Sequence, residues 1–162
     1  MNLLTVNVAL STLIFWIAAR LYLVPRLGAL RARDVLIPIL LLHAFRHLGL
    51  MFLAPGGRTA GMPEAFAVPA AIGDCVAAAL ALAALPAVVR GARIANALVW
   101  IFNIEGSIDL ALAITLATIH DAAPHMGAAY WIPAFWVPAL LVTHWITFVV
   151  LTRSKPAQPV RA

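Results

Sequence analysis

Five long apolar stretches, separated by short polar segments, constrain the fold of this chain more than any other feature. Each is long enough to cross a hydrocarbon layer about 30 Å thick as an α-helix. A continuous helix also satisfies its own backbone hydrogen bonds, which lipid cannot do. We therefore predict an all-α transmembrane domain over residues 1–152, followed by a disordered cytoplasmic tail over 153–162. The predicted spans are residues 3–24, 35–54, 67–89, 94–119 and 130–151.

Composition supports the same class. The chain is 64% hydrophobic and 10% charged, whereas soluble domains are about 25% charged. A soluble domain of this size buries only about two-thirds of its surface, so it could not hide so many apolar side chains. A soluble enzyme, a secreted disulfide scaffold and a disordered chain are excluded. The net charge of +5 is spread too thinly for a nucleic-acid groove, so we predict no nucleic-acid partner.

The basic residues predict an orientation. Nine of the 11 Lys and Arg residues fall on one side of the predicted spans. Because cytoplasmic loops carry an excess of positive charge, we expect the N-terminus outside and the C-terminus in the cytoplasm. The nine residues are Arg20, Arg26, Arg31, Arg33, Arg90, Arg93, Arg153, Lys155 and Arg161.

Polar and ionisable side chains interrupt four of the five spans near mid-membrane. A charged group there costs about 2.5 kcal/mol or more, so it should face the protein interior and have partners. With a rise of about 1.5 Å per residue, several of these groups reach similar depths. The predicted substrate- or proton-binding residues are Arg46, His47, Asp74, Glu105, Asp109, His43, His144 and Asn103.

Helical spacing predicts which of these side chains share a face. His43, Arg46 and His47 follow an i, i+3, i+4 pattern, which places them on one side of an α-helix. Glu105 and Asp109 are four residues apart and share a face of the fourth span. Asparagines lie on another side of that span, so we expect this helix to be central in the bundle.

The charges at mid-membrane do not balance. Arg46 contributes +1, and three carboxylates contribute −3, a nominal net charge of −2. A low-dielectric interior does not tolerate that imbalance, so protons or a bound cation must compensate it. We therefore expect the chain to bind or translocate a small cationic, polar-headed or lipid-soluble substrate in a proton-dependent way. A structural ion pair of Arg46 with Glu105 or Asp74 is the simpler alternative.

Two other functional classes remain open. One is an intramembrane enzyme that performs acid/base chemistry on a lipid-soluble substrate; no catalytic residue is assigned. The other is an accessory subunit of a larger membrane complex, and a homo-oligomer is also open. We predict no metal site and no cofactor. The spacing of His43 and His47 nevertheless resembles that of metal ligands, and His43 and His144 could in principle ligate haem.

Two helices carry packing signals. Pro133 and Pro138 should kink the fifth span, which makes it the candidate moving part. In the third span, Gly73, Ala77 and Ala81 recur every four residues, a small-residue stripe that lets helix backbones approach closely.

Several segments between Glu64 and Arg153 carry a family resemblance. They include Pro-Ala-Ala-Ile-Gly-Asp at 69–74, Val-Trp-Ile-Phe-Asn at 99–103 with Asp109, Tyr-Trp-Ile-Pro at 130–133, and the run from Val137 to His144. Together they resemble small, uncharacterised bacterial inner-membrane proteins of unknown function. The resemblance implies a multi-pass protein of the bacterial inner membrane whose first partner is the lipid bilayer, and it transfers no functional residue.

Overall fold

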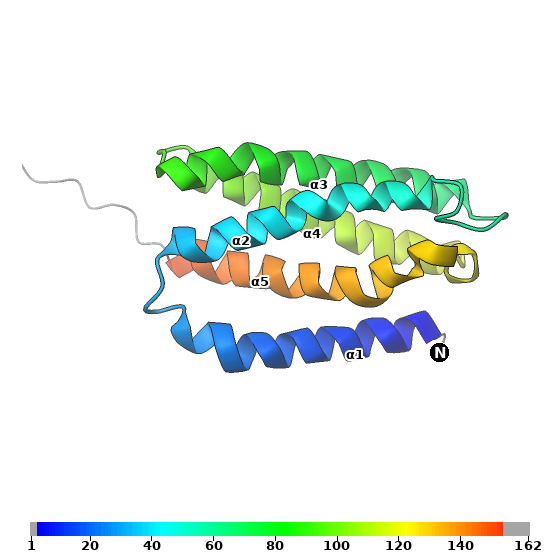
Figure 1. The fold of residues 1–162 in the computed structure, drawn as a ribbon, viewed down its shortest axis with the longest axis horizontal. Coiled ribbons are helices and arrows are strands. Elements are labelled where there is room, and N and C mark those ends of the chain that lie inside the picture. Colours follow the sequence, from blue (N-terminus) through cyan, green and yellow to red (C-terminus); the bar gives the residue numbers. More distant parts are fainter. Residues whose placement is uncertain (1–2, 154–162) are drawn as a thin grey trace, which may run out of the picture.

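The computed structural model describes residues 3–153, and within them every regular element is a helix. Five helical spans are long and apolar enough to cross a membrane, as predicted, and they lie side by side along one axis (Figure 1). The predicted tail lies outside the described residues, apart from Arg153, which ends the last helix. The spans are Leu3–Arg26, Ala32–Phe52, Glu64–Arg90, Ala95–Ile119 and Gly127–Arg153.

The helical elements are α-helices and shorter 3₁₀ or π-helical segments. The α-helices are α1 (Leu3–Ala18), α2 (Ala32–Ala44), α3 (Glu64–Arg90), α4 (Ala95–Ile119) and α5 (Val137–Arg153). The π-helical turns are η1 (Ala19–Leu23) and η6 (Ile132–Trp136). The 3₁₀ segments are η2 (Val24–Arg26), η3 (Phe45–Phe52), η4 (Ala123–His125) and η5 (Gly127–Tyr130), of which η4 lies in the loop before the fifth span.

Helices α2 to α5 form the packed body, and α1 lies at its edge. No residue of α1 is buried, and its neighbours are α5 and η6 (Figure 1). Two apolar clusters fill the interior, one toward each end of the bundle. Val99 and Phe102 belong to the first, and Phe66 and Met126 to the second. The buried polar side chains described below lie between these clusters.

Small residues let α3 pack closely against its neighbours. Ala77 and Ala81 are fully buried, as expected for the small-residue stripe. At Gly73, an added Cβ would overlap the carboxylate of Asp109 on α4. The stripe therefore brings α3 and α4 together and also makes room for a polar side chain.

The second span changes its helical pitch at Phe45. From there η3 is a 3₁₀ helix of 8 residues, longer than the three or four residues usual for this form. A 3₁₀ helix has 3.0 residues per turn, so residues three apart align and residues four apart do not. His43 and Arg46 therefore point inward, whereas His47 is exposed on another side. The prediction that all three share a face was wrong because it assumed α-helical pitch throughout.

The fourth and fifth spans depart from expectation in different ways. Helix α4 is not central, because one of its sides is exposed along its length. The exposed side chains Ile101, Ile104, Ile108 and Leu112 are between 45% and 64% accessible. The fifth span contains a π-helical turn, η6, that includes Pro133. A missing N–H at proline breaks the regular hydrogen-bond ladder, so the departure from α-helix lies at Pro133, whereas Pro138, the other proline predicted to kink this span, lies within α5.

Candidate functional site

The guanidinium of Arg46 is the centre of a buried polar cluster. The side chain projects from η3 and is almost completely buried, with 1% of the residue accessible. Its Nε donates to Asp74 Oδ1 on α3 at 2.7 Å, and its Nη1 donates to the Gly106 carbonyl on α4 at 3.1 Å. Its Nη2 donates to Asp109 Oδ2. One cation thus joins three membrane-spanning helices.

Three glycines make room for this cluster. An added Cβ at Gly106 would lie 2.7 Å from His144 Cε1 and 2.9 Å from Arg46 Nη1. At Gly49 on η3 it would overlap the side chain of Asp74, just as at Gly73 it would overlap Asp109. Sequence reasoning had treated Gly73 as a helix-packing residue and had not singled out the other two. The available signal is their position in the sequence, one to three residues from a buried charged residue.

His144 and Asn103 hold each other in a fixed orientation. Asn103 Nδ2 donates to the main-chain carbonyl of His144 at 3.3 Å, and its Oδ1 lies 2.7 Å from His144 Nδ1. A carbonyl only accepts, so the amide oxygen faces Nδ1 and Nδ1 must carry the proton. The opposite nitrogen, Nε2, is then the acceptor, and it lies 3.5 Å from Arg46 Nη1. The imidazole thus extends the Arg46 cluster to α5.

His43 lies beside His144 but has fewer hydrogen bonds. The ring centroids are 4.3 Å apart. The Thr143 hydroxyl donates to main-chain carbonyls of its own helix, so His43 Nε2, 2.9 Å away, must donate to it. His43 Nδ1 is then a buried acceptor with no partner in the described part of the chain. The two rings are in contact, which leaves no space between them for a haem.

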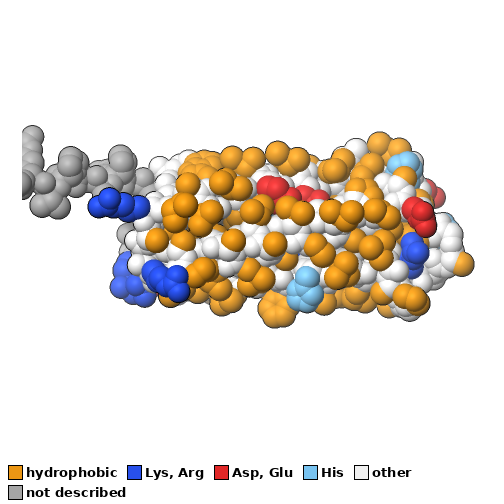
Figure 2. Space-filling model, turned by 90° about the horizontal axis from the view of Figure 1, so that it is seen from above, with side chains coloured by type: hydrophobic (Ala, Val, Ile, Leu, Met, Phe, Trp, Pro, Cys, Tyr) orange, Lys and Arg blue, Asp and Glu red, His pale blue; other side chains and the backbone are white. Residues whose placement is uncertain are grey.

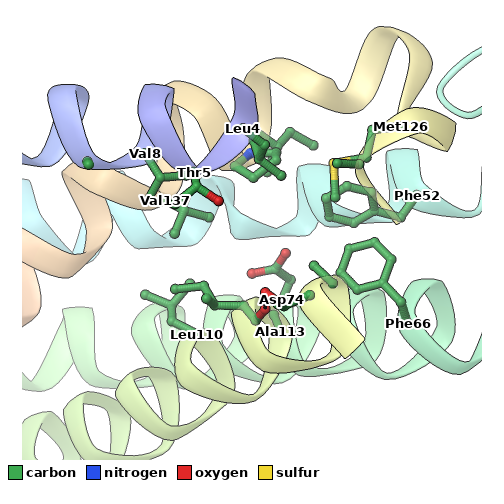
Figure 3. A pocket seen from close by; sticks show the side chains of 17 residues that line it. Leu4, Thr5, Val8, Phe52, Phe66, Asp74, Leu110, Ala113, Met126 and Val137 are labelled. Carbon is green, nitrogen blue, oxygen red and sulfur yellow. Dashed lines mark hydrogen bonds between the residues drawn. The ribbon is translucent and has the colours of Figure 1, made fainter. Parts of the chain in front are cut away.

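A cavity of about 280 Å³ opens onto the cluster. Its walls come from the N-terminal half of α1, the C-terminal half of α4, and parts of η3, α3 and η6. Figure 3 shows the carboxylate of Asp74 pointing into a space surrounded by apolar side chains such as Phe66, Leu110 and Val137. Among the described residues that line the cavity, Asp74 is the only charged one.

Comparison with known proteins places the chain in a family. Residues 3–152 match a family described as a domain of unknown function, DUF8737. The chain belongs to this family. No curated protein and no solved structure gives a significant match. The expectation of a family of unknown function is confirmed, and the DUF8737 match includes all five spans, the Arg46 cluster and the cavity.

Two of the predicted site residues lie apart from the cluster in this DUF8737 chain. Glu105 is half-buried on the outer side of α4, beside the exposed isoleucines, and forms no ion pair with Arg46. His47 is exposed, and its Nδ1 contacts the Ala44 carbonyl. His43 and His47 point in different directions, so they cannot share a metal ion. Within residues 3–153, no three His, Cys, Asp or Glu side chains form a group suited to metal binding.

The positive and negative charges of the Arg46 cluster do not cancel. Arg46 forms ion pairs with two carboxylates, Asp74 and Asp109, so the three groups together have a formal charge of −1. Arginine stays protonated in proteins, so a proton or another cation must supply any further compensation. Charge-assisted hydrogen bonds between arginine and carboxylates also have defined geometry. The site can therefore offer an oriented carboxylate to a positively charged group.

Proposed function

We propose that this DUF8737 protein binds a lipid-soluble molecule with a cationic headgroup. The apolar body of the ligand occupies the cavity, and its headgroup contacts Asp74. The single observation behind this proposal is that an apolar cavity ends at one carboxylate, which belongs to a cluster of net charge −1. Small-molecule sites commonly combine apolar walls with a few oriented polar groups.

The neighbours of Asp74 prepare its carboxylate for such a ligand. Arg46 Nε holds one carboxylate oxygen at 2.7 Å, which fixes the direction of the side chain. An ammonium group that enters the cavity can donate to this carboxylate and cancel the residual charge. A proton can cancel the same charge, so proton and ligand compete for the site. Binding is therefore proton-dependent and weakens as the pH falls.

The cavity walls suggest how a ligand enters from the bilayer. Helix α1 forms one wall, although it lies at the edge of the bundle and has no buried residue. The π-helical turn η6 contributes Ile132 and Pro133 to another wall. Displacement of either wall would open the cavity laterally to lipid. We include translocation of the ligand in the proposal, with η6 as the moving part.

The location of the protein is part of the same proposal. The described basic residues gather mainly at the end of the bundle where α1 and α5 finish (Figure 2). Under the positive-inside rule this end is cytoplasmic and the N-terminus is external. We propose the bacterial inner membrane as the location, on the basis of the resemblance described above.

The test compares a charged amphiphile with a neutral one of similar size. Purified protein in nanodiscs is titrated with radiolabelled decylamine or N-decylacetamide, and binding to empty nanodiscs is subtracted. We expect saturable binding of the amine only. Asp74→Asn should weaken it about tenfold, equivalent to about 1.4 kcal/mol. Glu105→Gln serves as the matched control because Glu105 does not line the cavity.

Two results would contradict this proposal. Equal binding of the neutral amide would show that charge plays no part in recognition. Unchanged amine binding by Asp74→Asn would show that the amphiphile binds elsewhere on the protein.

A further inference from the structure

A groove on the outer side of α4 holds a carboxylate that faces the lipid region. It has a volume of about 500 Å³ and is lined by Glu105 and Asp109 together with exposed apolar residues of the same helix. Glu105 is half-buried: its Oε2 is covered by the protein and has no hydrogen-bond partner in the described chain, so a group from outside the chain can reach the carboxyl group only at Oε1. Figure 2 shows acidic side chains half-way along an otherwise apolar face. A carboxyl group at this depth needs a polar partner.

A second polar group faces lipid from a different part of the bundle. His47 on η3 is exposed, and its Nδ1 lies 2.9 Å from the Ala44 carbonyl. A carbonyl only accepts, so Nδ1 carries the proton and Nε2 is left as an acceptor. The neighbouring side chains Phe45 and Leu50 are 53% and 50% exposed. Together, Phe45, His47 and Leu50 form an apolar ridge with one acceptor, here called the η3 ridge.

The groove and the η3 ridge match in depth and chemistry but lie on separate surfaces. Arg46 Nη1 donates to the Gly106 carbonyl at 3.1 Å, and His47 and Glu105 are the chain neighbours of these two residues, so they lie at a similar level along the bundle. The groove consists of α4 residues alone. Phe45 of the ridge instead neighbours Trp136 of η6, with ring centroids 6.5 Å apart. Glu105 and His47 therefore do not satisfy each other within one chain.

We propose that the η3 ridge of one copy of this chain packs into the α4 groove of a second copy, in the same membrane orientation. Parallel packing keeps both groups at matching depth, and His47 Nε2 then accepts a hydrogen bond from a protonated Glu105. This contact gives each of the two polar groups a partner in lipid, where such hydrogen bonds contribute to helix association.

The geometry also specifies the type of assembly. The two contacting surfaces are different, so each copy can use its ridge on one neighbour and its groove on another. Such a heterologous contact generates a closed ring when the rotation between copies closes. Asp109 lines the groove and also binds Arg46, so His47 of the second copy would lie beside the buried cluster. This inference does not depend on the proposed ligand.

Disulfide cross-linking in native membranes tests the contact. In a Cys75→Ser background, one tagged copy carries Leu50→Cys on the η3 ridge and a second copy carries Ile108→Cys in the groove, so both copies keep His47 and Glu105. We expect oxidation to cross-link the two tagged chains. The matched control pairs Leu50→Cys with Val76→Cys, an exposed position on α3. The expected yield is about tenfold above this control, because an interface holds two thiols at high local concentration.

Each cysteine variant expressed alone tests whether the same surface of two copies meets in a symmetric contact. Cross-linking of Leu50→Cys to itself, or of Ile108→Cys to itself, would indicate a symmetric contact and overturn the proposal. Native mass spectrometry of the unmodified protein provides an independent measurement. A mass of at least twice 17.3 kDa is expected, and a monomer at every concentration in mild detergent would contradict the assembly.

Discussion

At the scale of single residues, Arg46 has the largest number of buried polar partners. Replacing it with methionine removes the cation and leaves two buried carboxylates, Asp74 and Asp109, without their counter-charge. Breaking one side of a buried ion pair costs about 3–5 kcal/mol. We expect Arg46→Met to lower the free energy of unfolding by about this amount. Steric-trapping measurements of unfolding in bicelles would quantify it.

The controls for this prediction separate geometry from charge. Arg46→Lys keeps the charge but cannot donate in three fixed directions, so we expect it to recover only part of the stability. Arg93→Met removes an exposed cation at the bundle end and should change stability little. Equal losses for Arg46→Met and Arg93→Met would show that the buried network does not stabilise the fold.

Gly106 is the residue at which the packing of the cluster is tightest against both His144 and Arg46. An alanine there would place its Cβ 2.7 Å from His144 Cε1 and 2.9 Å from Arg46 Nη1. Overpacking of this kind costs about 1–3 kcal/mol. We expect Gly106→Ala to reduce the melting temperature, measured by differential scanning fluorimetry. Gly28→Ala is the matched control, because a Cβ there would meet no atom within 4 Å. A similar decrease in melting temperature for both variants would show that the close packing at Gly106 does not limit stability.

The residues of the cluster also show how far sequence reasoning reaches. Intramembrane charge is costly, which led to Arg46, Asp74, Asp109, Asn103 and His144, and the structure brings these five side chains together. The same argument selects three further residues: His43, which lies against the His144 ring, and His47 and Glu105, which lie apart from the cluster. Cost in lipid shows that a group needs a partner, but it does not show whether that partner lies in the same chain.

At the scale of elements, local changes in helical pitch decide which side chains meet. The α-helical period predicts that His47 shares a face with His43 and Arg46, which is wrong because the span becomes 3₁₀ at Phe45. Nothing in Phe-Arg-His-Leu-Gly-Leu-Met-Phe by itself requires that change. The close approach of Gly49 to Asp74 is visible only once the helices are packed. The number of spans and their approximate ends could therefore be predicted from the sequence, whereas the local helical pitch could not.

The π-helical turn η6 leads to a prediction about the cavity wall. Pro133 lies in this turn and lines the cavity. Pro133→Ala restores a backbone N–H and favours regular α-helix, which should rotate the wall and change the cavity shape. We expect decylamine binding to weaken about fivefold, about 1 kcal/mol, without loss of thermal stability. The nanodisc titration measures binding. Pro138→Ala is the control, because Pro138 does not line the cavity. Equal decylamine binding by the two variants would contradict a role for η6.

At the scale of the whole molecule, the charges separate into two groups with different effects. In the proposed orientation, the arginines at the end of the bundle where α1 and α5 finish face the cytoplasm. Arg46 at the middle acts on the packing of helices and is shielded from both aqueous phases by two apolar clusters. This division explains why a chain with only 10% charged residues can carry both a topology signal and a buried ionic site.

The proposed orientation makes a prediction that needs no knowledge of the ligand. In a Cys75→Ser background, Ala60→Cys and Ala92→Cys place single thiols at exposed positions in loops at opposite ends of the bundle. With the basic end in the cytoplasm, a membrane-impermeant maleimide should label Ala60→Cys in intact cells and Ala92→Cys only after lysis. The reverse labelling pattern would show the opposite topology. The cavity, which lies toward the Ala60 end of the bundle, would then lie nearer the cytoplasm.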